Sequence, residues 1–252
     1  MSEAAGGTTA RTPALEAHRL AEHRISPVQD YIRQIVFGGI DGIVTTFAVV
    51  AGFAGLAAEG TAEVGLAAVL LFGLANLLAD ATSMGLGEFL SARSEQDVYR
   101  AVRAKERSEI DTNPEAELAE TAEILGSHGV NEKDAAEMAA ILLRNPEMMA
   151  DFMMQYEIGL ADTTDERPWL NGLVTFGSFI LMGAIPLLPY FAAGAGTNVF
   201  LVSCTATFAA LVGLGALRWS VSLQSLARCV GETLLVGGTC AVVAYGVGMA
   251  FR

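Results

Sequence analysis

The sequence predicts an all-α membrane protein with five transmembrane helices and a cytoplasmic helical domain inserted between spans two and three. Three observations lead to this fold class. Of the 252 residues, 52% are hydrophobic and 17% are charged, and the mean hydropathy is +0.44, a composition typical of membrane proteins. Apolar stretches long enough to cross a bilayer recur along the chain. A single segment, residues 93–167, carries most of the charge and interrupts them.

The first two predicted spans each contain acidic residues. Within residues 34–58 the only ionisable residue is Asp41, and about 25 helical residues reach about 37 Å, more than the roughly 30 Å of bilayer hydrocarbon. Residues 64–92 are apolar apart from Asp80 and Glu88. Because this second stretch is longer than one crossing, we expect its helix to continue into water at one end.

Three more spans are predicted in the C-terminal third of the chain. Residues 168–217 contain no charged residue, but about 50 helical residues would be about 75 Å long, so the stretch must fold back on itself. We place the turn at residues 189–198. Residues 229–251, interrupted only by Glu232, supply span five. Spans three and four are then expected at about 169–189 and 198–217.

The distribution of basic residues predicts the orientation of the chain. Of the 15 Lys and Arg residues, all but Arg252 lie in segments that five crossings place on one side of the membrane. Basic residues that flank spans are retained in the cytoplasm, so we expect a cytoplasmic N-terminus and a C-terminus outside. Residues 1–33 mix basic and acidic residues without an apolar segment, and a cleaved signal peptide is not expected.

Charge and hydropathy together divide the chain into four predicted parts. The acidic part holds 18 acidic and 8 basic residues, a net charge of −10 out of −13 for the whole chain. Nucleic acid and anionic lipid headgroups attract basic surfaces, so neither is an expected partner, and cations are favoured. The parts are a cytoplasmic N-terminal segment (1–33), transmembrane helices one and two (34–92), a cytoplasmic acidic domain (93–167) and transmembrane helices three to five (168–252).

Three asparagines predict where helices of the acidic domain begin. Asn113 and Asn145 each precede a proline, and Asn131 follows Gly129 by two residues. Asparagine is a favoured N-cap and proline a favoured first helical residue. We therefore expect helices at about 92–111, 114–126, 132–143 and 146–160.

Polar residues inside the first two spans predict a path for ions. An isolated carboxylate such as Asp41 costs roughly 2.5 to 3.5 kcal/mol in a bilayer, so it must face a cavity or a partner. Passage of an ion or a proton is favoured over a packing role. In span two, one helical face carries Asn76, Asp80, Met84 and Glu88 at intervals of four. Carboxylate with thioether favours a transition metal such as ferrous iron; the alternative is that Glu88 snorkels to the interface and Met84 fills a gap.

The acidic domain contains a second group of candidate metal ligands. Two pairs of glutamates are each spaced by three residues, so each pair lies on one helical face, and the faces could converge across the turn at residues 113–114. Two thioethers and a carboxylate follow downstream. Spacing alone leaves open that the acids are solvated and the methionines form a core stripe. The candidates are Glu106, Glu109, Glu117, Glu120, Met153, Met154 and Glu157.

These motifs resemble the vacuolar iron transporter family, to which plant nodulin-21-like and many bacterial membrane proteins are similar. The resemblance rests on FGGIDGIVTTFAVVAG at residues 37–52, SMGLGE at 83–88 and the cytoplasmic ExxE, ExxE and MMxxE motifs, and it covers about residues 30–252. It implies a five-span homodimer that exchanges ferrous iron for protons, with the seven residues above as ligands of a cytoplasmic metal-binding domain. It also implies that Asp41 and Met84 act in translocation near the dimer interface.

The resulting prediction is a proton-coupled exporter of ferrous iron from the cytoplasm and not an enzyme. Its expected transport path is Asp41, Asp80, Met84 and Glu88, and Mn(II), Co(II) and Zn(II) suit the same ligands. One alternative is a membrane-anchored di-iron carboxylate oxidase, although such sites use a Glu-x-x-His pattern that this chain lacks. Another is a metal-gated passive cation channel. Ala- and Gly-rich composition without a sorting segment favours a bacterial inner membrane, with the vacuolar membrane as the alternative.

Overall fold

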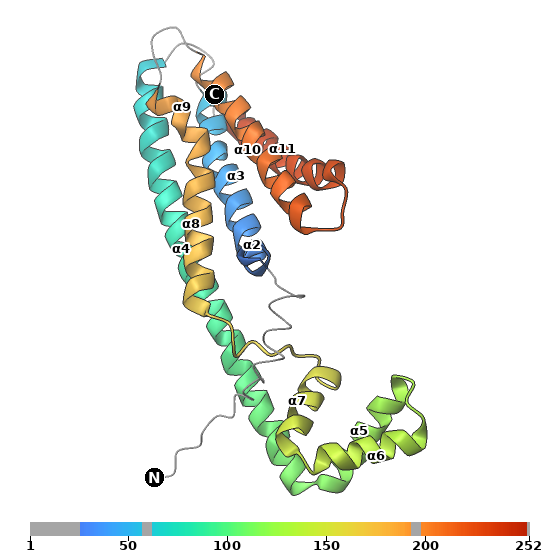
Figure 1. The fold of residues 1–252 in the computed structure, drawn as a ribbon. Coiled ribbons are helices and arrows are strands. Elements are labelled where there is room, and N and C mark those ends of the chain that lie inside the picture. The colour runs from blue at the N-terminus through green and yellow to red at the C-terminus, as the bar shows by residue number, and fades with distance from the viewer. Residues whose placement is uncertain (1–25, 57–61, 193–197, 251–252) are drawn as a thin grey trace, which may run out of the picture. The chain divides into compact units, whose positions relative to one another are not determined.

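The computed structural model describes residues 26–56, 62–192 and 198–250, and every regular element in those ranges is a helix (Figure 1). Most of the predicted N-terminal segment and parts of both predicted outer loops lie outside the described residues. The described residues form two compact units: one holds the residues up to Ala81 and from Val174 onward, and the other is Thr82–Leu173. The long helix α4 (Ala62–Thr112) contributes to both.

Five helical segments of the described chain are long and apolar enough to cross a membrane, in agreement with the predicted number of spans. The third is not one regular helix. Pro186 interrupts it with a single 3-10 turn, η1 (Ile185–Leu187), after which α9 (Leu188–Phe191) continues beyond the predicted start of the turn. The other elements are α3 (Ile32–Leu56), preceded by the short α2 (Pro27–Asp30), then α8 (Pro168–Gly183), α10 (Val199–Val221) and α11 (Leu226–Ala250).

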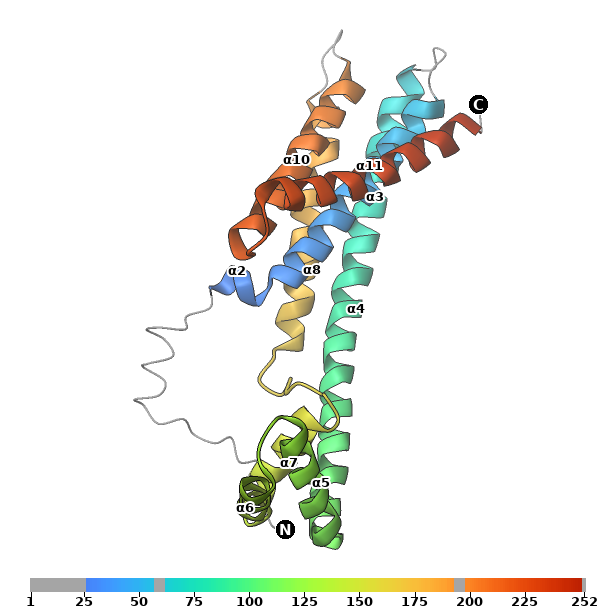
Figure 2. The same ribbon diagram turned by 90° about the vertical axis from the view of Figure 1, so that its right-hand side faces the viewer.

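In the first unit, α3 packs against α10 and α11 (Figure 2), and glycines of α3 approach α8 and α11 closely. A side chain added at Gly42 would collide with the backbone of Phe179 in α8, and one at Gly248 in α11 would collide with the backbone of Gly52. Close helix approach of this kind is typical of membrane bundles. An apolar cluster of Ile43, Leu211 and Leu214 fills the space between α3 and α10.

The second unit contains the charged half of α4 and three shorter helices: α5 (Pro114–Ser127), α6 (Glu132–Leu143) and α7 (Pro146–Tyr156). Their core comprises Ile110, Leu142, Met149, Ala150 and Met153. All three helices begin where the sequence predicts. Helix α7 ends four residues earlier than predicted, because Gly159 adopts a left-handed φ of 74° and the backbone turns away.

The predicted side-chain caps are correct for only one of the three helices. Asn131 Oδ1 accepts a hydrogen bond from the Asp134 amide at 3.0 Å. The side chains of Asn113 and Asn145 make no such bond. The Asn145 amide instead donates to the Ile141 carbonyl at 2.9 Å, so it closes the preceding helix. The prolines alone mark the starts of α5 and α7.

Candidate metal centre

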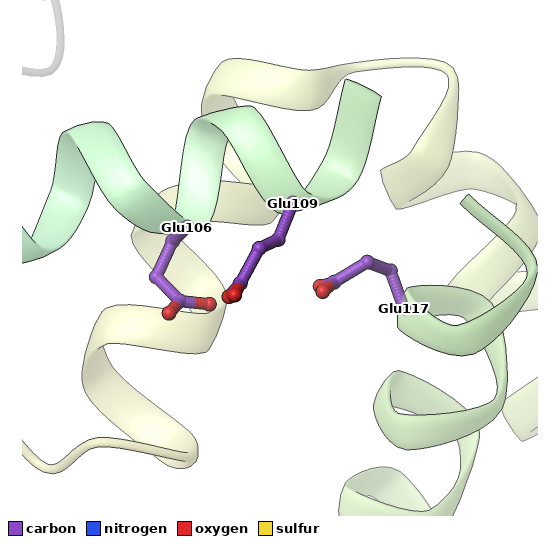
Figure 3. Close-up of side chains that lie close together, drawn as sticks. All are labelled: Glu106, Glu109 and Glu117. Atoms are coloured by element: carbon purple, nitrogen blue, oxygen red, sulfur yellow. The ribbon is translucent and has the colours of Figure 1, made fainter. Parts of the chain in front are cut away.

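Three glutamates from two helices converge in the second unit. Glu106 and Glu109 project from the last turns of α4 and Glu117 from the first turn of α5, and one carboxylate oxygen of each lies within 4.8 Å of the other two (Figure 3). A single residue, Asn113, separates the two helices. This tight turn brings together three of the four glutamates of the predicted ExxE pairs. Glu120, the fourth, is exposed and is not part of this group.

Glu106 and Glu117 are buried, although both are acidic. Each retains only 5% of its exposed surface, and Glu117 Oε2 has no hydrogen-bond partner. A buried carboxylate oxygen without a partner is costly. A cation that binds at this oxygen would remove that cost. The donor set therefore fits a divalent metal, whereas solvated acidic faces would not be buried.

Burial and repulsion between carboxylates raise the pKa of three glutamates in this region. Burial, followed by repulsion from Glu120 and the other glutamates, raises the pKa of Glu117 to about 7. Burial also raises the pKa of Glu106, with repulsion from Glu157 as the next cause. The pKa of Glu157 is raised by burial and then by Glu120 and Glu109. All five predicted glutamates thus act on one another electrostatically.

The two predicted methionines are inside the domain. Met153 and Met154 retain 0% and 1% exposure. The hydroxyl of Thr121, one turn after Glu117 in α5, donates to Met153 Sδ at 3.5 Å. Met153 also belongs to the apolar core, so the core-stripe interpretation describes part of its environment. Sequence reasoning missed Thr121, although its spacing of four from Glu117 puts both on one face of α5.

A lysine at the edge of the cluster was also missed. Lys105 Nζ lies 3.3 Å from Glu109 Oε1. Its positive charge lowers the pKa of Glu106 and Glu157, against the larger effects that raise them. Lys105 and Glu109 are four residues apart in α4, so they are neighbours on one helical face, and this spacing could have identified the pair. Lys105 is an exposed counter-ion at the edge of these carboxylates.

In the first unit, two predicted path residues act on each other. The carboxylates of Asp41 in α3 and Asp80 in α4 are close enough for electrostatic repulsion. The side-chain amide of Asn76 donates to Asp80 Oδ2 at 2.7 Å. The hydroxyl of Thr45 donates to the Asp41 backbone carbonyl at 2.8 Å and not to its carboxylate. The structure therefore relates a carboxylate of span one to one of span two.

The predicted stripe on span two is half-buried throughout. Asn76, Asp80, Met84 and Glu88 all have intermediate exposure, and they flank the fully buried positions of the same helix. Met84 and Glu88 belong to the second unit. Their part in a transport path stays a prediction.

Glu232 in α11 forms ion pairs. It accepts hydrogen bonds at 3.0 Å each from Arg218 of α10 and from Arg228 of its own helix.

A membrane bundle joined to helices with a buried, converging carboxylate cluster is the architecture of a membrane protein that handles metal cations. The sequence model of the VIT family matches residues 32–249, and the chain therefore belongs to that family. Among similar proteins are the vacuolar iron transporter of Toxoplasma gondii, 36% identical over 236 residues (90% of this chain, 76% of the relative), and vacuolar iron transporter 1 of Oryza sativa subsp. japonica, 32% identical over 223 residues (88% and 86%). Vacuolar iron transporter 1 of Arabidopsis thaliana is 32% identical over 216 residues (86% and 84%).

These comparisons confirm the resemblance inferred from the sequence motifs. The relatives are named as transporters, which agrees with the prediction that the chain is not an enzyme. The family match covers both the apolar helices and the acidic domain.

Proposed function

We propose that this protein exports ferrous iron from the cytoplasm in exchange for protons. The observation that carries the proposal is the buried cluster of Glu106, Glu109 and Glu117, in which Glu117 Oε2 has no hydrogen-bond partner. Membership of the VIT family and the names of the relatives support iron as the cargo. Metal capture at the cluster is the first step.

The chemistry of the donors suits a borderline metal. Five glutamates supply hard oxygen ligands, and Met153 and Met154 supply soft thioethers; this mixture favours ferrous iron over magnesium or calcium. Mn(II), Co(II) and Zn(II) accept the same ligands and are secondary candidates. Glu157 follows the last residue of α7, where the helix dipole disfavours a carboxylate and a bound cation would stabilise it.

Translocation is assigned to Asp41, Asp80, Met84 and Glu88. In this proposal the metal leaves the acidic domain, passes the carboxylates and the thioether of these two helices, and crosses as protons enter. Asp41 and Asp80 repel each other when both are charged, and a passing cation would reduce this repulsion. Two copies of the chain, arranged as a homodimer, would double this set of acids.

Energetics constrain the exchange. At about 150 mV, negative inside, moving a divalent cation outward costs about 7 kcal/mol, and each entering proton recovers about 3.5 kcal/mol. About two protons therefore only offset the voltage, and uphill export requires the pH difference or a further proton. The proposal places the N-terminus in the cytoplasm and the C-terminus outside, in a bacterial inner membrane or, as the names of the relatives suggest, a vacuolar membrane. Metal moves away from the cytoplasm in either case.

A flux assay in proteoliposomes tests this function. Ferrous iron uptake is measured under anaerobic conditions with and without an imposed pH gradient, for the wild type, Glu117→Gln and Glu115→Gln. Glu115 is exposed and adjacent in α5, which makes it the matched control. We expect gradient-driven uptake that Glu117→Gln diminishes and Glu115→Gln preserves. Uptake at the same rate with and without the pH gradient would instead indicate a passive channel.

A further inference from the structure

We propose that Arg103 and Arg107 are positioning residues of the metal centre, which hold helix α7 so that its last turn presents Met153, Met154 and Glu157 to the glutamates. This inference rests on the proposed metal-binding function. It concerns residues of α4 and α7 that contact none of the expected ligands through their charged groups.

The contacts form one network between two helices that are distant in sequence. Arg103 Nε donates to Asp151 Oδ1 at 2.7 Å, and an Arg103 terminal nitrogen donates to Glu147 Oε2 at 3.0 Å. Arg107 Nε donates to Glu147 Oε1 at 2.9 Å. Glu147 is thus held by two guanidinium groups, which lower its pKa. Arg103 binds two acids one helical turn apart.

These charges are arranged on faces next to those of the ligands. Arg107 follows Glu106 directly in α4, and Asp151 precedes Met153 by two residues in α7. The network ties the first two turns of α7 to α4 and leaves the third turn, with its thioethers, to meet the cluster. Arg103 and Arg107 side chains retain 28% exposure each, so solvent screens them less than it would a fully exposed pair.

Connectivity explains why α7 needs such a constraint. Helices α4 and α5 are joined by the single residue Asn113, so the short covalent connection keeps their glutamates close together. Helix α7 follows only after α6, so its placement depends on noncovalent contacts. The apolar core supplies some of these, but apolar contacts are less directional than hydrogen bonds between guanidinium and carboxylate groups. Metal affinity depends on how well the surroundings of ligands hold them in place.

A charge-reversal experiment on the full-length protein in detergent tests the inference. Mn(II) binding is titrated by calorimetry for the wild type, Arg103→Glu, Asp151→Arg and the double variant. Arg100→Glu is the matched control, since Arg100 forms an ion pair with Asp97 within its own helix and not with α7 among the described residues. Arg103→Glu should weaken Mn(II) binding about three- to tenfold, and the double variant should recover most of the loss.

The sign of the effect separates positioning from simple charge. Arg103→Glu makes the domain more acidic, which by itself would strengthen cation binding, as Arg100→Glu is expected to do slightly. Hydrogen exchange of α7 in the metal-free protein should be faster in Arg103→Glu and normal in the double variant and in Arg100→Glu. Binding by Arg103→Glu that equals or exceeds that of the wild type would overturn the inference, as would weakened binding that the double variant does not restore.

Two further measurements keep the result interpretable. If Arg103→Glu does not fold, Arg103→Gln is measured in the same way, with weaker binding and faster α7 exchange as the supporting result and unchanged binding as the opposing one. Failure of the proposed function looks different, because the wild type would then bind no Mn(II), or Glu117→Gln would bind it equally well.

Discussion

At the scale of single residues, the buried carboxylate of Glu117 determines much of what this protein is expected to do. It is 5% exposed, and one of its oxygens has no hydrogen-bond partner. The metal-free domain therefore contains a group that burial and like charges both destabilise. A bound divalent cation would satisfy this oxygen and reduce the repulsion, so metal binding and domain stability are linked.

Replacing Glu117 by glutamine removes a ligand but keeps its size. We expect Mn(II) affinity to fall at least about tenfold, since a metal site loses comparable affinity even when residues that support its ligands are lost. Calorimetric titration of the full-length protein measures this change. Glu115→Gln in the first turn of the same helix should leave affinity unchanged, and equal losses in both variants would contradict a ligand role for Glu117.

The raised pKa of Glu117 predicts a pH-dependent stability. The pKa of Glu117 is about 7 in the folded protein, and its ordinary value of 4.5 applies to the unfolded chain. Between pH 4.5 and pH 7 the folded state therefore binds more protons than the unfolded state. Stability therefore falls as pH rises from about 4.5 to about 7. Thermal unfolding of the metal-free protein should show a higher midpoint at pH 5.5 than at pH 7.5, and Glu117→Gln should reduce this difference. A flat profile in the wild type would contradict the electrostatic account.

Lys105 should tune the affinity of the cluster. Its ammonium lies 3.3 Å from Glu109 Oε1, so an entering cation is repelled by Lys105 or must displace it. We expect Lys105→Gln to tighten Mn(II) binding about threefold, the scale of an exposed ion pair. Lys133→Gln, an equal charge change at an exposed position of α6, is the control. Tightening of the same size in both would indicate net charge alone.

Spacing predicted some of these residues and could not have predicted others. The ExxE pairs lie on helical faces because residues three apart are neighbours on any helix, and a one-residue turn made the faces meet. The Lys105–Glu109 pair, four residues apart within α4, follows from the same kind of helical spacing. The contact of Thr121 with Met153 and the Arg103 network instead depend on how α7 packs against α5 and α4. That placement comes from tertiary contacts between segments about 30 to 50 residues apart, and no local pattern encodes it.

At the scale of helices, the length of the apolar stretches predicted the membrane spans correctly, whereas the residues at which helices end were predicted less accurately. The apolar stretch of span two was longer than one bilayer crossing, and the structure continues it as α4 over 51 residues. Proline and glycine changed the details: Pro186 breaks the third span into a 3-10 turn, and Gly159 ends α7 early. Each effect is local, but which proline interrupts a helix depends on the packing around it.

Glycine packing between α3 and α8 gives a prediction at this scale. An alanine at Gly42 would collide with the backbone of Phe179. A methyl group added at Gly177 in α8 would meet no packing neighbour within 4 Å. We expect Gly42→Ala to destabilise the protein in detergent by about 1 to 3 kcal/mol, as overpacking does. Gly177→Ala should be neutral or slightly stabilising, because alanine favours helix. Thermal unfolding of both variants measures the contrast; equal midpoints would argue against this close contact.

At the scale of the whole molecule, composition and charge were sufficient to predict the fold class. Five apolar segments and one acidic segment gave the five candidate spans and the inserted helices of the structure. The sequence placed Asp41 and Asp80 in separate spans and could not show that the two carboxylates are near enough to repel each other. The direction of transport, its coupling to protons and the assembly of two copies belong to the proposal.

The account as a whole requires that capture of metal and its passage through the membrane use different residues. In the proposal, Glu117 and its neighbours bind the metal, while Asp41, which belongs to the unit of apolar helices, takes part in the exchange. The most direct measurement is ferrous iron flux driven by a pH gradient in proteoliposomes containing Asp41→Asn, with Mn(II) binding titrated on the same preparation. The account predicts that gradient-driven flux is lost while binding persists. Flux equal to that of the wild type would contradict it.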